Sequence, residues 1–272
     1  MPDPIRITLL GAGGRMGRAI ARLALDDPRC DLAAAWVREG SDVAGKTVGS
    51  LLGRGDGQIV AGTDLQAAIR AADVVIDFTR PATAVRAAGL CAEFGKGFVS
   101  GTTGFTAGER GELERAATRI PVLWAPNMSV GVNLLLRALD EVARRLGRDY
   151  DAEIVEVHHR HKVDAPSGTA LALGEILART RGEPLADLMD CGRAGHAGER
   201  VAGRIGMHSL RGGEIVGEHE VRLIAAGEEI RLGHVAFSRD AFAAGALRAA
   251  CWLHGRPPGF HGMADVLGFG DS

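Results

Sequence analysis

The chain has 272 residues, of which 46% are hydrophobic, and its formal net charge at pH 7 is −2. This length suits two domains that can each bury a core. The absence of a basic excess argues against a nucleic-acid partner. Apolar runs are too short to span a bilayer and no signal-peptide pattern precedes the first strand, which predicts a cytoplasmic protein with no membrane partner. Its four cysteines (Cys30, Cys91, Cys191 and Cys251) lack metal-ligand spacing and are expected to be reduced and mostly buried.

A glycine-rich loop follows the first predicted strand, residues 5–10. It reads Gly11-Ala12-Gly13-Gly14-Arg15-Met16-Gly17 and leads into a helical apolar pattern. A strand, a glycine loop and a helix in this order are typical of the start of a dinucleotide-binding unit. In such a unit, backbone N–H groups at the helix N-terminus hold a pyrophosphate. Met16 stands where the common G-x-G-x-x-G spacing has its third glycine, so Gly11, Gly14 and Gly17 are the better match.

The second predicted strand covers residues 31–37 and is followed by Arg38 and Glu39. In dinucleotide-binding folds, an acidic residue about twenty positions after the glycines binds the ribose hydroxyls. Val37 cannot do this, whereas the guanidinium of Arg38 suits the 2′-phosphate of NADPH. The sequence therefore predicts that the protein binds a nicotinamide dinucleotide and favours NADPH over NADH. NADH stays open because Glu39 could still reach the ribose.

Three further strands are predicted at residues 72–78, 98–100 and 120–124, with helices at 66–70 and 82–94. In an open α/β sheet, ligands lie beyond the carboxyl ends of the strands. The loops after the first two of these strands are therefore expected at the nicotinamide. Their residues include Thr79, Gly101, Thr102 and Thr103.

The most distinctive stretch is residues 156–169, Glu-Val-His-His-Arg-His-Lys-Val-Asp-Ala-Pro-Ser-Gly-Thr. Each of residues 158–162 can carry a proton or a positive charge, and they follow a strand predicted to end at His158. Ser167 is a natural N-cap for a helix predicted over 170–179, whose first turn offers N–H groups to an anion. Lys162 is one of only three lysines in a chain that otherwise uses arginine, and lysine can release its proton. The pattern predicts a pocket for a small carboxylate that must also receive a proton.

Beyond residue 130 the pattern changes. Apolar residues from Leu135 to Leu146 mark one face of a long helix, and strands are predicted at 205–210, 215–225 and 229–237. They indicate a second domain with an open mixed sheet, expected to be largely antiparallel, whose broad face needs a partner such as a second copy of the chain. Residues 191–200 are typical of a functional loop or a lid. A final amphipathic helix is predicted over 239–254.

Together these motifs closely resemble the dihydrodipicolinate reductase family over nearly the whole chain. The resemblance is carried by residues 11–17, 77–79, 101–104, 127–133 and, above all, 156–169. It implies a Rossmann-like α/β dinucleotide-binding domain (1–128), an α+β substrate-binding and tetramerisation domain (129–238), and a C-terminal helix (239–272) that returns to the first domain. It also implies reduction of 4-hydroxy-tetrahydrodipicolinate by NADPH or NADH, with loss of water, in diaminopimelate and lysine biosynthesis, by a homotetramer.

The same resemblance implies roles for individual residues. His158 matches the proton donor, and Lys162 matches a second acid that also contacts the substrate. The remaining substrate positions match His159, Ser167, Gly168 and Thr169. Cofactor contacts match residues 11–17, Arg38, Phe78, Thr79, residues 101–103, Ala125, Pro126, Asn127 and Met128. Val37 departs from the family, which often has an acid there, and this leaves the preference between NADH and NADPH open.

The histidine-rich stretch is also open to other functions. A metal site would use His159 and His161 on one side of a strand, but no third ligand has matching spacing and Arg160 and Lys162 would repel a cation, so no metal is expected. A nucleic-acid patch lacks interleaved aromatic residues. A non-catalytic NADP sensor would not need His158 and Lys162. A dehydrogenase for another amino-dicarboxylate, such as aspartate, would need the same anion-binding groups and stays open.

Overall fold

The computed structural model describes residues 3–269, which divide into two compact units. Unit 1 takes in the described residues of 1–130 and 239–272, and unit 2 comprises Gly131–Ser238. Within residues 3–269, no helix combines the length and the apolar character that a membrane crossing requires.

Unit 1 is built on a seven-stranded sheet in the order β12-β6-β5-β4-β1-β2-β3, and all its strand pairings are parallel. Nearly every residue of the central strands is buried, because helices cover both faces of the sheet. Its strands are β1 (Ile5–Leu10), β2 (Cys30–Trp36), β3 (Ala61–Gly62), β4 (Val74–Asp77), β5 (Gly97–Ser100), β6 (Pro121–Trp124) and β12 (Gly259–His261).

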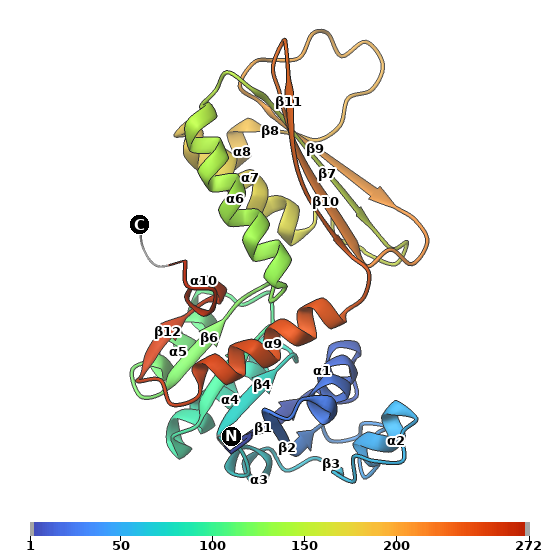
Figure 1. Cartoon of the computed structure of the whole chain (residues 1–272), viewed down its shortest axis with the longest axis vertical. Coiled ribbons are helices and arrows are strands. Elements are labelled where there is room, and N and C mark those ends of the chain that lie inside the picture. The colour runs from blue at the N-terminus through green and yellow to red at the C-terminus, as the bar shows by residue number, and fades with distance from the viewer. Residues whose placement is uncertain (1–2, 270–272) are drawn as a thin grey trace. The chain divides into compact units, whose positions relative to one another are not determined.

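Two apolar cores lie on opposite faces of this sheet. One is formed with α1 and α9, which contact each other and lie side by side in Figure 1. The other is formed with α3, α4 and α5. The helices are α1 (Arg15–Asp26), α2 (Val48–Leu52), α3 (Leu65–Arg70), α4 (Pro81–Phe94), α5 (Ala107–Ala117), α9 (Asp240–Leu253) and α10 (Met263–Val266).

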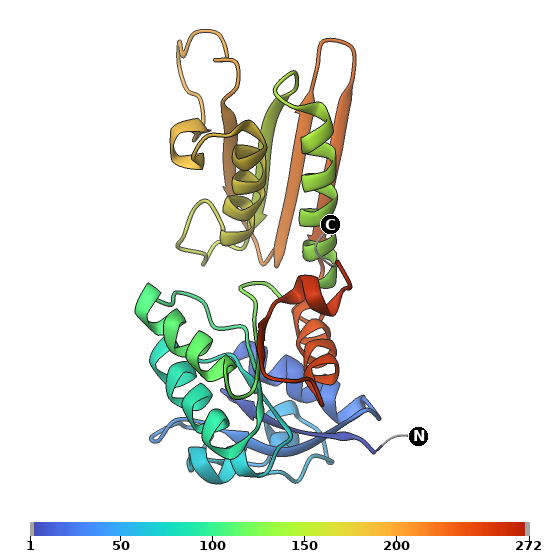
Figure 2. The same ribbon diagram turned by 90° about the vertical axis from the view of Figure 1, so that its left-hand side faces the viewer.

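Unit 2 places α6 (Val130–Leu146), α7 (Gly168–Arg181) and α8 (Leu185–Leu188) on one face of a five-stranded sheet, as Figure 2 shows for α6 and α7. The strand order is β11-β10-β7-β9-β8. Even-numbered residues of β7 and odd-numbered residues of β9 face the helices, as the period of two in a strand requires. The strands are β7 (Asp151–His158), β8 (Met189–Asp190), β9 (Ile205–Arg211), β10 (Gly217–Ile224) and β11 (Glu229–Ala236).

The predicted fold class, a Rossmann-like α/β unit followed by an α+β unit with an open mixed sheet, is confirmed. The expectation of a largely antiparallel second sheet is wrong, because two of its four pairings, β7 with β9 and β8 with β9, are parallel. Helices α7 and α8 lie between β7 and β8 in the chain and return it to run in the same direction. Beyond the final helix, the chain forms β12, which extends the edge of the first sheet beside β6.

Candidate active site

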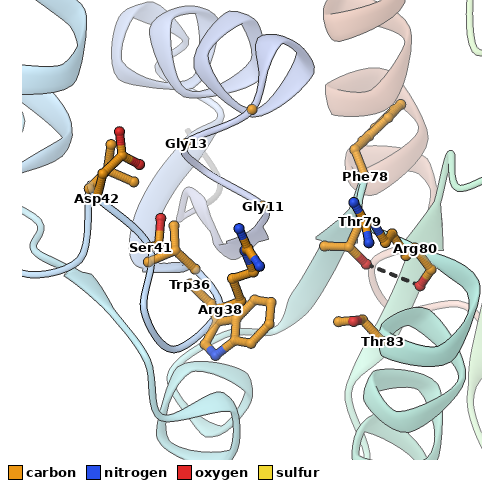
Figure 3. A pocket seen from close by; sticks show the side chains of 13 residues that line it. Gly11, Gly13, Trp36, Arg38, Ser41, Asp42, Phe78, Thr79, Arg80 and Thr83 are labelled. Carbon is orange, nitrogen blue, oxygen red and sulfur yellow. Dashed lines mark hydrogen bonds between the residues drawn. The ribbon is translucent and has the colours of Figure 1, made fainter.

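A pocket of about 470 Å³ opens beyond the carboxyl ends of β1 and β4 in unit 1. The strand order reverses here, because β2 and β3 lie on one side of β1, whereas β4, β5 and β6 lie on the other. Such a reversal creates the crevice in which open α/β sheets bind ligands. Figure 3 shows Gly11, Gly13 and Arg38 on one side of this pocket and Phe78 and Thr79 on the other.

The glycine loop packs tightly against the start of α1. Gly11 has a φ of +80°, a conformation that strongly favours glycine. A Cβ atom on Gly17 would lie only 2.2 Å from the carbonyl oxygen of Gly11, so only glycine fits there. Gly14 is the N-cap of α1 and donates its N–H to the same carbonyl oxygen at 2.9 Å. Because the first turn of α1 has no acidic side chain, its N–H groups suit an anion such as a pyrophosphate.

The pocket contains part of the predicted cofactor set and adds to it. The predicted residues that line it are Gly11, Gly13, Gly14, Arg38, Phe78 and Thr79. The lining residues that the prediction missed are Trp36, Val37, Ser41, Asp42, Val43, Arg80 and Thr83. Arg80 could have been found, because it directly follows Thr79 in the loop. Residues 41–43 reach the pocket only because the chain turns back after Arg38, where Ser41 donates its N–H to the Arg38 carbonyl.

Four residues of the glycine loop lie outside this lining: Ala12, Arg15, Met16 and Gly17. Ala12 and Gly17 are buried beneath the loop, and Arg15 is exposed. Val37 is only 4% exposed, although it lines the pocket. A carboxylate at position 37 would therefore be buried among apolar residues.

Asp77, the last residue of β4, joins two of the predicted loops. Its buried carboxylate accepts hydrogen bonds from the hydroxyls of Thr79, Ser100 and Thr102 at 2.5 to 2.7 Å. Thr79 also donates its backbone N–H to the Thr102 hydroxyl at 3.0 Å. Burial raises the pKa of Asp77, against the effect of these hydrogen bonds. The loops of Phe78–Thr79 and residues 101–103 thus lie together, and a Cβ on Gly101 would overlap the Phe78 ring.

The last predicted cofactor segment, residues 125–128, follows β6 on the same edge of the sheet. Ala125 and Met128 are buried, so only their backbone can meet a ligand, whereas Pro126 is exposed. None of these four residues lines the pocket described above, and neither do residues 101–103.

A second cluster lies in unit 2, at the end of β7. His158, which is 12% exposed at its side chain, makes a 2.5 Å hydrogen bond between its Nδ1 and Glu156 Oε2. The ring of His158 also meets that of His219 edge to face, with centroids 5.1 Å apart. Burial lowers the pKa of His158, and Glu156 only partly opposes this effect. His219 is more deeply buried, and burial with the nearby His158 lowers its pKa to about 4.

The predicted N-cap of α7 is confirmed. The Ser167 hydroxyl accepts the backbone N–H of Ala170 at 3.2 Å and lies 3.0 Å from His219 Nε2. The helix N-terminus, with Gly168 exposed, therefore begins beside the His158 cluster. This arrangement brings titratable side chains and the N-terminal turn of a helix together, as the sequence predicts.

Lys162 and His159 lie in the turn between β7 and α7. Lys162 Nζ donates to both carboxylate oxygens of Asp164, at 2.7 and 2.8 Å. His159 and His161 have ring centroids 6.1 Å apart, but they lie in this turn and not on a strand as the metal-site alternative assumed. Across residues 3–269, no three His, Cys, Asp or Glu side chains group as a metal site would require.

The glycine-rich loop at residues 191–200 is tied to the other end of β7. Arg193 and Arg200 both donate to Glu153, and Arg200 also donates to Asp151 at 2.5 Å. Asp151 and His158 are separated by the length of the strand, roughly 23 Å at the usual rise per residue. Within this chain the loop therefore does not cover His158 as a lid would.

The comparisons with known proteins agree with this geometry. Residues 5–128 match the family model described as dihydrodipicolinate reductase, N-terminus, and residues 131–267 match the one described as dihydrodipicolinate reductase, C-terminus. The chain belongs to the dihydrodipicolinate reductase family. The chain is thus an oxidoreductase, and its N-terminal part is a dinucleotide-binding unit.

Relatives of the same family cover almost the whole chain. The 4-hydroxy-tetrahydrodipicolinate reductase of Hahella chejuensis is 48% identical over 263 residues, covering 97% of this chain and 98% of the relative. That of Anaeromyxobacter dehalogenans is 47% identical, with 97% of both chains covered. Among solved structures, dipicolinate-bound dihydrodipicolinate reductase from Paenisporosarcina sp. TG-14 is 23% identical, with a TM-score of 0.75 over 95% of this chain and 97% of that one. At that identity the likeness supports the fold.

Proposed function

We propose that this chain reduces 4-hydroxy-tetrahydrodipicolinate to tetrahydrodipicolinate with loss of water, in diaminopimelate and lysine biosynthesis. The observation that carries the proposal is the cluster in unit 2, where His158 lies beside the N-terminus of α7 and the Lys162 turn. A reductase for a dicarboxylate needs a proton donor and groups that bind carboxylates, and this cluster offers both. The nicotinamide dinucleotide, when bound, supplies the hydride.

In the proposed mechanism, His158 donates the proton that completes the reduction, and Lys162 acts as a second acid that also contacts the substrate. An ammonium group has three donors, so Lys162 keeps one for a substrate carboxylate while it holds Asp164. The N-terminus of α7, from Ser167 to Thr169, would bind a carboxylate through the positive end of the helix dipole. His159 would contact the same substrate from the turn.

A coupled assay tests this function. The product of pyruvate and aspartate-semialdehyde condensation is supplied to the protein, and the loss of reduced nicotinamide absorbance is followed with NADPH and with NADH. Turnover with either cofactor supports the proposal. Binding of NADPH without turnover refutes it and favours a dehydrogenase for another amino-dicarboxylate, or a sensor.

Single variants then test the two proposed acids. His158→Ala and Lys162→Ala should each lower kcat by about 100-fold or more, because a positioned acid contributes that much. NADPH affinity should stay unchanged, since both residues belong to unit 2. Wild-type turnover in either variant removes that residue from the mechanism.

We further propose that the cofactor pocket prefers NADPH through Arg38 and Arg80. Both line the pocket, and position 37 offers no acid to the ribose. Loss of a guanidinium–phosphate contact costs about 1.5–3 kcal/mol, so Arg38→Ala should weaken NADPH binding roughly 10- to 100-fold and leave NADH binding unchanged. Arg119→Ala, an exposed arginine of unit 1 outside the pocket, is the control. Equal losses for both cofactors would refute recognition of the 2′-phosphate.

The proposed assembly is a homotetramer formed through the open face of the unit 2 sheet. Its helices cover one face only, and the other face carries the partly exposed apolar side chains of Leu210 and Val235. Replacing both with aspartate should convert a tetramer to smaller species in light scattering; a wild-type protein that is already monomeric refutes the proposal. We place the protein in the cytoplasm, in keeping with its biosynthetic role and four free thiols.

A further inference from the structure

Glu156 is the most completely buried charged side chain in the unit 2 cluster, with 1% of the side chain exposed. It lies two residues before His158 on β7, so both side chains project from the same face of the strand. Neighbouring strands complete its surroundings, because Ser209 of β9 and His219 of β10 pair with Glu156 on either side.

Each carboxylate oxygen of Glu156 accepts at least two hydrogen bonds. Arg211 donates to Oε1 at 2.7 Å and to Oε2 at 2.9 Å, a bidentate pair that fixes the plane of the carboxylate. His158 Nδ1 lies 2.5 Å from Oε2, and the backbone N–H of Ser167 donates to Oε1 at 3.2 Å. Glu156 therefore connects the proposed proton donor with the first residues of the proposed carboxylate site.

The charge of Glu156 decides which nitrogen of His158 carries the proton. Burial opposes ionisation, but the hydrogen bonds from Arg211, Ser209 and His158 outweigh it and lower the pKa of Glu156 to about 2. An ionised carboxylate only accepts hydrogen bonds, so Nδ1 of His158 must be protonated. Nε2 remains for chemistry, and Gly217 leaves room beside it, because a Cβ there would lie 3.0 Å from Nε2.

We infer that Glu156, held by Arg211, is a positioning residue that keeps His158 in the Nδ1-protonated form and aims Nε2 at the substrate. This inference rests on the proposed role of His158 as proton donor. The charged and titratable groups around His158 are Glu156 on its own strand, Arg211 on β9, His219 on β10 and Lys162 in the turn. Of these four, only Glu156 stabilises the imidazolium from which a proton is donated.

The chain provides a closely matched control on the same strand. Glu153 also accepts from arginines, and its Oε2 lies 2.7 Å from His208 Nε2. It projects from the opposite face of β7 because it lies an odd number of residues from Glu156. Glu153→Gln therefore removes a partly buried, arginine-paired carboxylate without touching His158.

The test compares E156Q with E153Q in the full-length protein. Glutamine keeps the shape of Glu156 and one acceptor oxygen but loses its charge. E156Q should lower kcat about 10- to 100-fold with little change in KM. Loss of a carboxylate in direct contact should also move the pH at which kcat declines downward by about one unit or more. E153Q should leave both quantities as in the wild type.

Nitrogen NMR of ¹⁵N-labelled His158 tests the positioning role without relying on turnover. In the wild type the Nδ1 signal should be that of a protonated nitrogen at neutral pH, and in E156Q the two tautomers should mix. An unchanged His158 spectrum and pH profile in E156Q would overturn the inference, and so would an equal change in E153Q. If instead His158→Ala keeps wild-type turnover, the proposed function of His158 fails, whereas the tautomer measurement still decides the positioning role.

Discussion

Replacing Gly17 with alanine is a direct test of the packing that forms the proposed cofactor pocket. The new methyl group would stand 2.2 Å from the Gly11 carbonyl oxygen and 2.8 Å from the Ala12 Cα. Both are backbone atoms of the loop, so a side-chain rotation cannot relieve the overlap, and α1 must move away from the loop. Since the N–H groups at the start of α1 belong to the proposed pyrophosphate site, stability and cofactor binding should suffer together.

The magnitude follows from two opposing effects. Alanine in place of a helical glycine stabilises by up to about 1 kcal/mol, whereas overpacking against fixed neighbours costs about 1–3 kcal/mol. Gly17→Ala should therefore be near neutral to about 2 kcal/mol destabilising. Gly89→Ala, at an exposed position of α4 with no atom within 4 Å of the new Cβ, should give the stabilisation alone.

The two variants are compared by thermal unfolding and by NADPH titration. Their Tm values should differ by several degrees, at about 2–4 °C per kcal/mol for a chain of this size. NADPH affinity should fall about tenfold or more in Gly17→Ala and stay unchanged in Gly89→Ala. If the two variants had equal Tm values and equal NADPH affinities, the glycine loop would accommodate the Gly17→Ala methyl group without loss of stability. The argument from the 2.2 Å approach would then be wrong.

Three further outcomes follow from other contacts. Asp77→Ala leaves three hydroxyl donors without their acceptor, so unfolding should become easier by about 1–3 kcal/mol and NADPH should bind more weakly in titration. His219 has a folded-state pKa of about 4 against an ordinary value of 6.5, so its protonation favours the unfolded chain and the stability of the protein should fall as the pH drops from 6.5 to 4. In thermal melts at several pH values, His219→Asn should reduce this loss of stability. An unchanged pH dependence in the variant would contradict the assignment to His219. The Sγ atoms of Cys30 and Cys251 lie 3.9 Å apart, so a thiol oxidant such as diamide should join them in a disulfide that peptide mass mapping can detect. The Cys191→Ser variant should form the same disulfide. Loss of the disulfide in that variant would contradict the pairing of Cys30 with Cys251.

Local sequence signals were sufficient for most of the elements and for the chemical character of the site. The glycine loop between a strand and a helix predicted the dinucleotide fold, because glycine spacing and apolar periodicity act over a few residues. Ser167 was predicted as an N-cap for the same reason, since capping involves only the next three residues. The residues from Glu156 to Thr169 predicted a proton donor beside an anion site, and the structure places His158 beside the N-terminus of α7 at the end of β7.

Tertiary structure alone decided which distant residues complete these sites. Arg211 meets Glu156 because β9 runs parallel to β7, and His219 meets Ser167 because β10 runs antiparallel on its other side. Neither strand direction follows from local pattern, which is why the second sheet was expected to be largely antiparallel. The burial of Val37, likewise, depends on strands and helices far away in the chain. Short-range periodicity determines which elements form, whereas the order and direction of strands determine which charges become buried partners.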